Sequence, residues 1–214
     1  MELRAHGIIL RTRLLTETSL VVQWLTVEYG RIATAAKGAR RAKSPFRGKL
    51  DLFFEGEFTY VLSRRSSLHT LKEFHLTDTH SALRHDLGYL QQASYAAALL
   101  EQATESDTPL PAVHALFLGF LQFLGRAAAS PKGIFAFELK LLQELGLRPE
   151  FDEASVSVGS KKVMQHLADE PWEQIFALEL NTSQSTEIRQ FLHGFLIFHL
   201  GKFPASRAGA LHPG

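Results

Sequence analysis

The hydrophobic pattern of the first 76 residues is that of short β-strands. Runs rich in apolar, β-branched and aromatic residues are separated by turn signals such as Tyr29-Gly30, which is how strands read in a sequence. Five such runs occur, at residues 7–13, 20–27, 31–36, 53–60 and 68–76. The fourth alternates with a period of two, which places successive side chains on opposite faces of a sheet. Five short strands without a helical pattern between the first three predict a small closed or half-closed barrel. Closure would remove the exposed sheet edges of so short a sheet.

From residue 78 onward the apolar residues recur at the spacing of helices. Thr108-Pro109 and Ser130-Pro131 each combine a capping residue with a proline suited to the first helical position. The helix opened by Ser130-Pro131 is apolar nearly all round and stops at Gly146, so it should be central to a helical bundle. Further helices are expected at residues 85–105, 162–168, 172–178 and 183–200, with a loop at 149–160.

These patterns predict an α+β protein of two domains. Residues 1–77 are expected to form a five-stranded barrel, basic in charge, and residues 78–204 an all-helical domain. Residues 205–214 are rich in Gly, Ala and Pro and are expected to be a frayed tail.

Composition narrows the class of protein further. No run approaches the roughly 20 apolar residues of a membrane-spanning helix, and the N-terminus lacks the apolar segment of a signal peptide, so we expect a cytoplasmic protein with no membrane contact. The sequence contains no cysteine. Disulfides, thiolate nucleophiles and cysteine-ligated zinc are therefore excluded together.

The net charge of +1 conceals an uneven distribution of charge. Residues 1–75 hold 13 Lys/Arg and 7 Asp/Glu, a balance of +6, whereas residues 76–214 hold 10 and 15, a balance of −5. Such asymmetry indicates a polyanionic partner for the basic part, or simply two parts that attract each other.

The basic residues concentrate in one segment. Between residues 31 and 49 the sequence has no acid and seven cations: Arg31, Lys37, Arg40, Arg41, Lys43, Arg47 and Lys49. Gly, Ala and Ser separate most of them, which lets cations approach a phosphate backbone closely. Arginine also stacks on bases. The segment favours binding of a polyanion over a merely solvated run of charge.

The sequence carries no motif of a known catalytic site. It lacks the glycine-rich phosphate loops, the paired-histidine zinc motif and the nucleophile elbow. Of its ten histidines, His75, His80 and His85 are five apart, which is neither a strand face nor a helix turn, and His193 and His199 are six apart and do not share a helix face. Asp51, Glu55 and Glu57 could gather a divalent cation, as in a nuclease, but alternating acids are also ordinary on a solvated strand. We expect no enzyme activity, no metal and no cofactor.

Several blocks of the sequence stand out, in this order: Gly7–Arg13, Thr26–Ile32, Ala36–Arg41, Leu68–Glu73, Phe137–Leu142 with Leu145-Gly146, His199–Lys202, and Ser206-Arg207. In their order and spacing these blocks resemble the RecO family of bacterial recombination mediators. The resemblance implies an N-terminal OB-fold and a C-terminal helical domain. It also implies a non-enzymatic bacterial protein, cytoplasmic and associated with the nucleoid. Such a protein binds single- and double-stranded DNA, anneals complementary strands and, with RecR, helps load RecA onto strands coated by single-strand binding protein (SSB).

The resemblance also suggests which residues contact these partners. The family's basic turn falls on Lys37, Arg40 and Arg41, continued here by Lys43, Arg47 and Lys49, and the hairpin with Arg64 and Arg65 is a plausible second DNA contact. In the family the acidic and apolar C-terminal tail of SSB docks on the helical domain. Lys132 and Lys140 are the candidate cations for that tail. The apolar residues around them are also consistent with an ordinary hydrophobic core beside two solvated lysines.

One feature of the family is missing. Many members carry paired Cys-x-x-Cys zinc motifs after the Leu-Gly block, where this sequence reads Phe151–Gly159 without a ligand pair. The zinc finger is therefore absent. Two alternatives to the DNA-binding function remain open: an OB-fold protein that binds RNA, and a metal-dependent nuclease using Asp51, Glu55 and Glu57.

Overall fold

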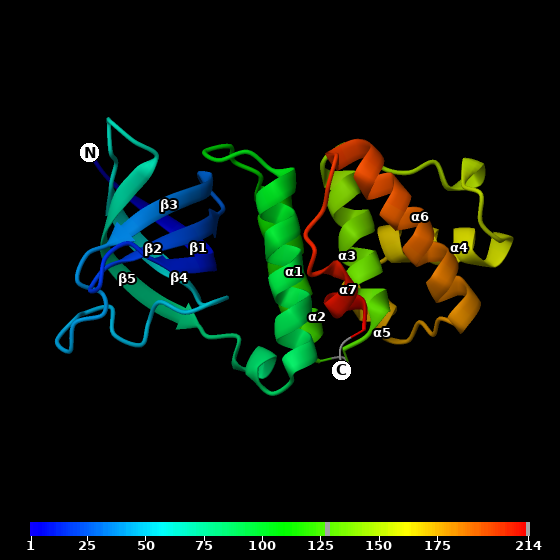
Figure 1. Ribbon diagram of the computed structural model, residues 1–214, viewed down its shortest axis with the longest axis horizontal. Helices are drawn as coiled ribbons and strands as arrows, with labels where there is room; N and C mark the ends of the chain where they lie inside the picture. The colour runs from blue at the N-terminus through cyan, green and yellow to red at the C-terminus, as the bar shows by residue number, and fades with distance from the viewer. Residues whose placement is uncertain (127–128, 213–214) are drawn as a thin grey trace. The chain divides into compact units, whose positions relative to one another are not determined.

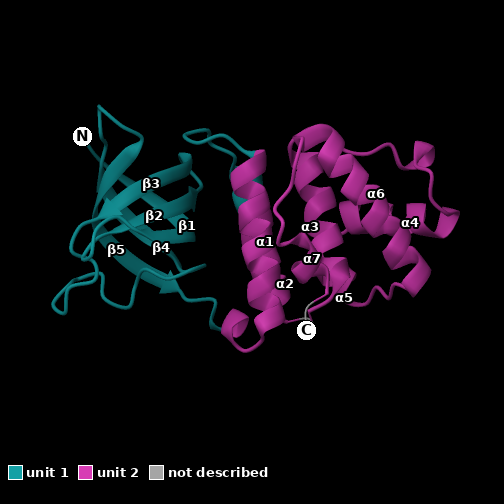
Figure 2. Cartoon of the chain, viewed as in Figure 1, with its two compact units in different colours: residues 1–81, 104–114 teal, residues 82–103, 115–214 magenta. Residues whose placement is uncertain are grey.

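The chain forms two compact units in a computed structural model, which describes residues 1–126 and 129–212. The first unit comprises Met1–Ser81 together with Thr104–His114, and the second comprises Ala82–Ala103 and Ala115–Gly214 (Figure 2). The first stretch of this first unit runs to Ser81, whereas the sequence predicts a barrel domain of residues 1–77. The first unit also includes the segment Thr104–His114, which the sequence pattern assigns to the helical domain.

The first unit is built on a closed barrel of five strands in the order β1-β2-β3-β5-β4 (Figure 1). The strands are β1 (Glu2–Leu14), β2 (Leu20–Thr26), β3 (Gly30–Ala36), β4 (Glu55–Val61) and β5 (Leu68–Asp78). All neighbours are antiparallel except β3 and β5, which are parallel. The five strands and the OB-fold barrel expected from the sequence are confirmed.

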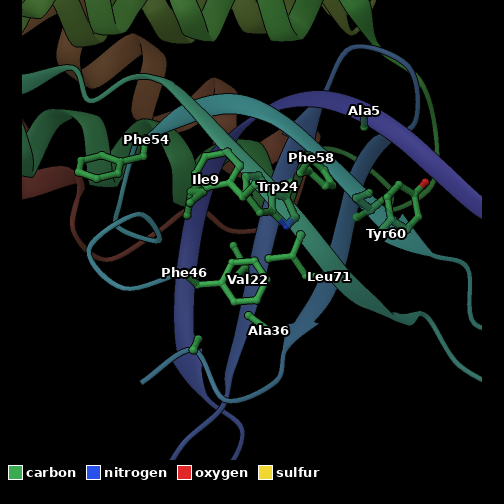
Figure 3. Close-up of a cluster of buried hydrophobic side chains, with 13 residues drawn as sticks. Ala5, Ile9, Val22, Trp24, Ala36, Phe46, Phe54, Phe58, Tyr60 and Leu71 are labelled. Atoms are coloured by element: carbon green, nitrogen blue, oxygen red, sulfur yellow. The ribbon is translucent and has the colours of Figure 1, made fainter. Parts of the chain in front are cut away.

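An aromatic cluster fills the barrel (Figure 3). The indole ring of Trp24 stacks on Phe58 with the ring centroids 4.1 Å apart, and its Nε1–H donates to Thr34 Oγ1 at 2.8 Å. The hydrogen bond to Thr34 matters because a buried indole N–H without an acceptor would destabilise the fold. The alternation of β4 arises here, since Phe58 and Tyr60 point into this cluster.

The second unit is helical. Its elements, after the turn η1 (Ser81–Arg84) at the boundary, are α1 (Leu87–Ala103), α2 (Pro111–Leu124), α3 (Pro131–Glu144), η2 (Phe151–Glu153), α4 (Val158–Asp169), α5 (Trp172–Phe176), α6 (Thr182–Leu200) and α7 (Arg207–Leu211). The first residues of α2, up to His114, belong to the first unit. Helix α3 is buried along most of its length, as its all-round apolar pattern predicts. It ends before Gly146, whose φ of 73° lies in the left-handed region that glycine tolerates best.

Two expectations for this unit are wrong. Residues 207–211 form helix α7 with Arg207, Ala210 and Leu211 buried, so this part of the expected tail is ordered. The expected loop at 149–160 is also shorter, because α4 begins at Val158, where the Ser157 side chain accepts the N–H of Ser160. Residues 213–214 lie outside the described part of the chain.

A buried ion pair explains the ordered C-terminus. The guanidinium of Arg207 donates to both carboxylate oxygens of Glu138 at 2.7 Å, and Tyr95 Oη donates to the same carboxylate at 2.6 Å. Burial and the nearby Glu138 charge raise the pKa of Tyr95 well above its ordinary value, which keeps its hydroxyl a donor. The short α7 is therefore held to α3 by charge as well as by apolar contact. Among residues 1–126 and 129–212, every helix is too short or too polar to span a bilayer.

Candidate nucleic-acid interface

The basic segment after β3 is an exposed loop with a fixed backbone. Two of its residues, Ala39 and Phe46, insert their side chains into the barrel core and are each 6% exposed. The six cations between and around them are all exposed: Lys37, Arg40, Arg41, Lys43, Arg47 and Lys49. The apolar anchors hold the loop on the barrel while the charged side chains point to solvent, and we call residues 37–49 the basic loop.

Consecutive tight turns determine the path of the basic loop. Backbone hydrogen bonds of 3.0–3.2 Å join Arg41 N to Gly38 O, Ser44 N to Arg41 O and Arg47 N to Ser44 O. Gly38 permits the first turn because its φ is 66°. The β1–β2 hairpin supports the loop from the side: Arg40 N donates to Thr18 O at 3.0 Å.

The positive charges of the basic loop are not neutralised inside the protein. Within residues 1–126 and 129–212, none of its six cations lies within 4.0 Å of a carboxylate oxygen. Arg40 and Arg47 each donate once, to the carbonyls of Glu17 at 2.9 Å and Ala42 at 3.2 Å, which orients both guanidinium groups without cancelling their charge. Such a surface attracts a polyanion from solution.

Arg31 lies at the other end of β3 and is not part of this group. The strand separates it from Lys37 by roughly 20 Å at the rise of a β-strand. Its Nε donates to Thr104 Oγ1 at 2.8 Å and a second guanidinium nitrogen donates to the Thr104 carbonyl. Arg31 therefore helps to attach the segment after α1, and the structure does not bring it to the basic loop.

The hairpin between β4 and β5 holds Arg64 and Arg65, both exposed. Because β3 and β5 run parallel, with Ala33 opposite Leu68, this hairpin lies toward the Arg31 end of β3. The hairpin is ordered by His69, whose Nδ1 accepts the Ser63 N–H at 3.3 Å and whose ring stacks on Tyr60 at 5.2 Å. The barrel thus carries exposed cations at both ends of β3.

A groove of ≈ 500 Å³ runs between the basic loop and the outer face of β4 and β5. Three of its lining cations are Lys49 from the loop, Arg4 and Lys72. Sequence analysis missed Arg4 and Lys72 because neither belongs to the concentrated basic segment, and only the pairing of β1, β4 and β5 places them on one surface. Arg4 also forms an exposed ion pair with Glu57, which lowers the pKa of that carboxyl through its hydrogen bond and charge.

The three acids considered for a nuclease do not form one site. Glu57 faces Arg4, and the Asp51 carboxylate accepts the N–H of Leu52. Glu55 is buried and faces His6 and His80, so its interpretation as an ordinary solvated strand residue is wrong. The structure groups Glu55 instead with Asp78 and His80.

Lys132 and Lys140 contact two different segments of the helical unit. Lys132 Nζ donates to the carbonyls of Phe176 and Leu178 at 2.8 and 2.9 Å, and Lys140 Nζ donates to those of Ala168 and Glu170. Burial lowers the pKa of both lysines. Both side chains are thus engaged at the C-terminal ends of α5 and α4, where cations are favourable.

The fold and this surface define a class: an OB-fold barrel with an exposed basic loop, followed by a helical unit. Two family models match, the N-terminal domain of recombination protein O over residues 1–80 and its C-terminal domain over residues 84–161. Relatives named DNA repair protein RecO include those of Bacillus pumilus, 30% identical over 78% of this chain, and Myxococcus xanthus, 33% identical over 67%. The chain belongs to the RecO family.

The matches do not span the relatives completely. They cover 64% of the Bacillus pumilus protein and 59% of the Myxococcus xanthus protein, about three fifths of each. Since the chain has no cysteine, its residues after Gly146 do not fit the cysteine zinc site that many family members carry.

Proposed function

We propose that this chain binds DNA through the basic loop and acts in recombinational repair without catalysing a reaction. It anneals complementary single strands and, with RecR, helps load RecA onto SSB-coated DNA, as a cytoplasmic protein associated with the nucleoid. The observation that carries the proposal is the set of six exposed cations, unpaired with acids and fixed on an OB-fold barrel, in a chain of the RecO family.

The arrangement suits contacts to phosphates rather than to base edges. Neutralising phosphates releases condensed counterions, which makes binding strong at low salt and largely independent of sequence. The loop is held by Phe46 and by its turns, so little ordering entropy is lost on binding. Annealing requires two polyanions to approach each other, and the cations at both ends of β3 reduce the repulsion between them.

A pair of double variants tests the DNA contact. Arg40→Ala with Arg41→Ala should weaken binding to single-stranded DNA and lower the slope of log affinity against log salt by about 1.4, or about 0.7 per lost contact. Lys162→Ala with Lys202→Ala removes the same charge from exposed sites of the helical unit and should leave the slope unchanged. Equal effects of the two pairs would show that only net charge matters. Matched RNA binding more tightly than DNA would favour the RNA-binding alternative.

The annealing function needs its own measurement. Complementary strands, bare or coated with SSB, should anneal faster with the chain than without it, and the Arg40/Arg41 variant should lose most of this acceleration. Incubation of labelled DNA with Mg²⁺ or Mn²⁺ should give no cleavage. DNA binding without annealing would restrict the proposal to a binding module, and cleavage would replace it with the nuclease.

For the SSB tail we propose the hollow of ≈ 590 Å³ beside Lys132 in the helical unit. Phe176, Leu178 and Leu180 supply apolar lining, and Arg126 and Lys132 supply cations, which suits a peptide with an aromatic end and carboxylates. Arg126 is exposed, whereas Lys132 already donates to two carbonyls. A fluorescent tail peptide should therefore lose affinity with Arg126→Glu and keep it with Lys162→Glu. Lys140 does not line this hollow, and unchanged affinity with Arg126→Glu would move the peptide elsewhere.

A further inference from the structure

The imidazole of His80 is buried at the end of β5 without a hydrogen-bond partner. Its side chain is 4% exposed, and neither Nδ1 nor Nε2 has a partner within hydrogen-bonding distance in the described residues. Its backbone has a φ of 45°, in the left-handed region that non-glycine residues seldom adopt. A buried polar group without a partner is costly, so its position calls for a physical explanation.

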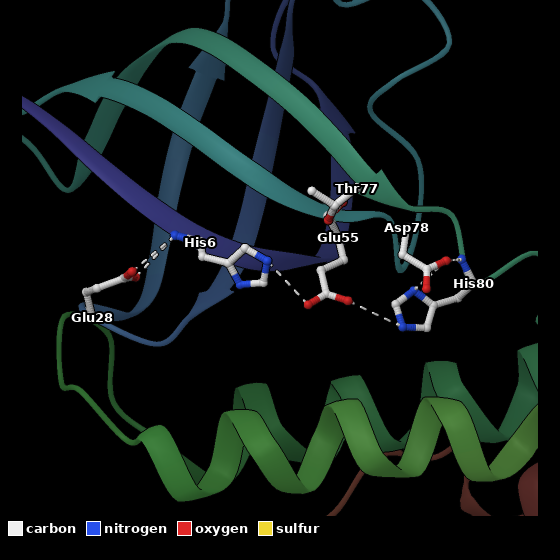
Figure 4. Close-up of polar contacts among 6 residues, drawn as sticks. All are labelled: His6, Glu28, Glu55, Thr77, Asp78 and His80. Atoms are coloured by element: carbon white, nitrogen blue, oxygen red, sulfur yellow. Dashed lines mark hydrogen bonds and ion pairs between the residues drawn. The ribbon is translucent and has the colours of Figure 1, made fainter.

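Two carboxylates face this imidazole (Figure 4). Glu55 Oε2 lies 3.7 Å from Nε2, and Asp78 Oδ1 lies 3.9 Å from Nδ1. One ligand atom from each of the three residues lies within 4.8 Å of the others. On the opposite side of the Glu55 carboxylate, His6 Nε2 lies 3.4 Å from Oε1. All four residues belong to the barrel unit.

These separations are too long for direct hydrogen bonds, which join heavy atoms at about 2.7–3.2 Å. One imidazole gives one nitrogen to one ion, and with one ligand atom from each residue the three atoms lie within 4.8 Å of one another. Ligand atoms about 2.0–2.1 Å from a tetrahedral Zn²⁺ lie about 3.3–3.4 Å apart, so metal binding would draw the three side chains closer together. Imidazole together with carboxylate oxygen is a donor set that Zn²⁺ and related divalent transition metals accept.

The backbone around the cluster is already fixed. Thr77 Oγ1 donates to the Glu55 carbonyl at 3.0 Å, which joins the start of β4 to the end of β5. Asp78 Oδ1 accepts the His80 N–H at 2.7 Å and so sets the turn that carries the imidazole. The three side chains therefore converge because of the barrel's closure and this turn, before any ligand is bound.

We propose that Glu55, Asp78 and His80 bind one divalent transition-metal ion of the Zn²⁺ type, with His6 supporting Glu55 from its other oxygen. The site replaces the expectation of no metal drawn from sequence, and it is unrelated to the cysteine zinc site of the family. A bound ion would connect the start of β4 to the end of β5 and stabilise the barrel, since it binds the folded chain preferentially.

Titration of the metal-stripped full chain with Zn²⁺ tests the site, with Co²⁺ absorption as a second readout of the ligand field. One equivalent should bind and raise the melting temperature. His80→Asn and Glu55→Gln should weaken binding by more than about tenfold, because even outer-shell partners are worth about 10–100-fold. Asparagine tolerates the left-handed backbone at residue 80, so the variant should fold without metal.

The matched control is His75→Asn. His75 is exposed on the same strand and should make no difference to the isotherm or to the Co²⁺ spectrum. Circular dichroism of the metal-free variants checks folding independently of binding. Absence of stoichiometric binding by the parent chain would overturn the proposal, as would binding that His80→Asn and Glu55→Gln leave intact.

Discussion

The cations of the basic loop and those of the helical unit differ in what they contact. In the loop, Lys37, Arg41 and Lys43 are exposed and have no carboxylate within ion-pair distance among the described residues. In the helical unit several cations are engaged by the protein itself, among them Lys132 and Lys140 by backbone carbonyls, Arg148 by Asp169 and Arg207 by Glu138.

This difference separates two uses of positive charge. A cation that donates to buried carbonyls or carboxylates stabilises the fold and has little capacity left for a ligand. An exposed cation without an acid beside it contributes little to stability and keeps its charge for a partner. Whether a cation is already bonded within the protein, rather than how many cations a surface has, therefore indicates where a polyanion binds.

The largest effect on stability is expected at the buried ion pair. Among the described residues, Arg207→Met leaves the buried Glu138 carboxylate with Tyr95 as its one remaining side-chain partner. Breaking such a buried pair costs about 3–5 kcal/mol. Arg148→Met is the matched control, because its pair with Asp169 is 36–40% exposed and such pairs are worth at most about 1 kcal/mol. Chemical denaturation of both variants measures the difference. Equal losses would mean that the Glu138–Arg207 pair gains nothing from being buried.

A smaller loss is expected when the basic loop loses its apolar anchor. Phe46→Ala removes a buried ring from the barrel core and should cost about 3 kcal/mol, the lower end for such changes because a loop can partly collapse into the space. DNA binding should weaken as well, although every cation is retained, because the loop loses its fixed position. Phe46→Leu, which keeps an apolar anchor, should restore most of both. Undiminished DNA affinity in Phe46→Ala would show that loop order is irrelevant to binding.

Lys132→Met should destabilise the helical unit by about 1–2 kcal/mol. The change removes two charge-assisted hydrogen bonds, so the carbonyls of Phe176 and Leu178 lose their protein donor and must be hydrated instead. The salt slope of DNA binding should stay unchanged. Lys162→Met, at an exposed position, is the control and should change stability by less than about 0.5 kcal/mol. A fall in DNA salt slope on Lys132→Met would place DNA on the helical unit and contradict the comparison.

The sequence was informative where structure depends on local pattern. Alternation and turn signals located the strands, and the concentration of cations between residues 31 and 49 located the basic loop. Arg31 falls within that group in the sequence because a count along the chain ignores the length of β3. In the structure, Arg31 and Lys37 lie at opposite ends of this strand. The helical period likewise predicted α3, which is buried as its apolar faces require.

What could not be predicted depends on contacts between distant segments. Glu55 meets Asp78 and His80 only because β4 and β5 pair with Glu55 opposite Asp78. The acid at residue 55 looks solvated in sequence, since burial of a charge is decided by its partners rather than by its own strand. Arg207 presents the same difficulty: its polar, Gly- and Ala-rich neighbourhood suggests a frayed end, and its partner Glu138 is 69 residues away.

The smallest effect on stability is expected at the basic loop itself. Arg41→Gln with Lys43→Gln removes two exposed charges that form no ion pair among the described residues. The free energy of unfolding should therefore change by less than about 0.5 kcal/mol. The slope of log affinity against log salt for single-stranded DNA should nevertheless fall by about 1.4. Denaturation and DNA titration on one preparation measure both quantities, with Lys162→Gln and Lys202→Gln as the charge-matched control. The opposite result would be a double variant that destabilises the barrel and leaves the salt slope unchanged. The basic loop would then be a structural element. In that case, the presence or absence of internal partners for a cation would not identify the DNA-binding surface.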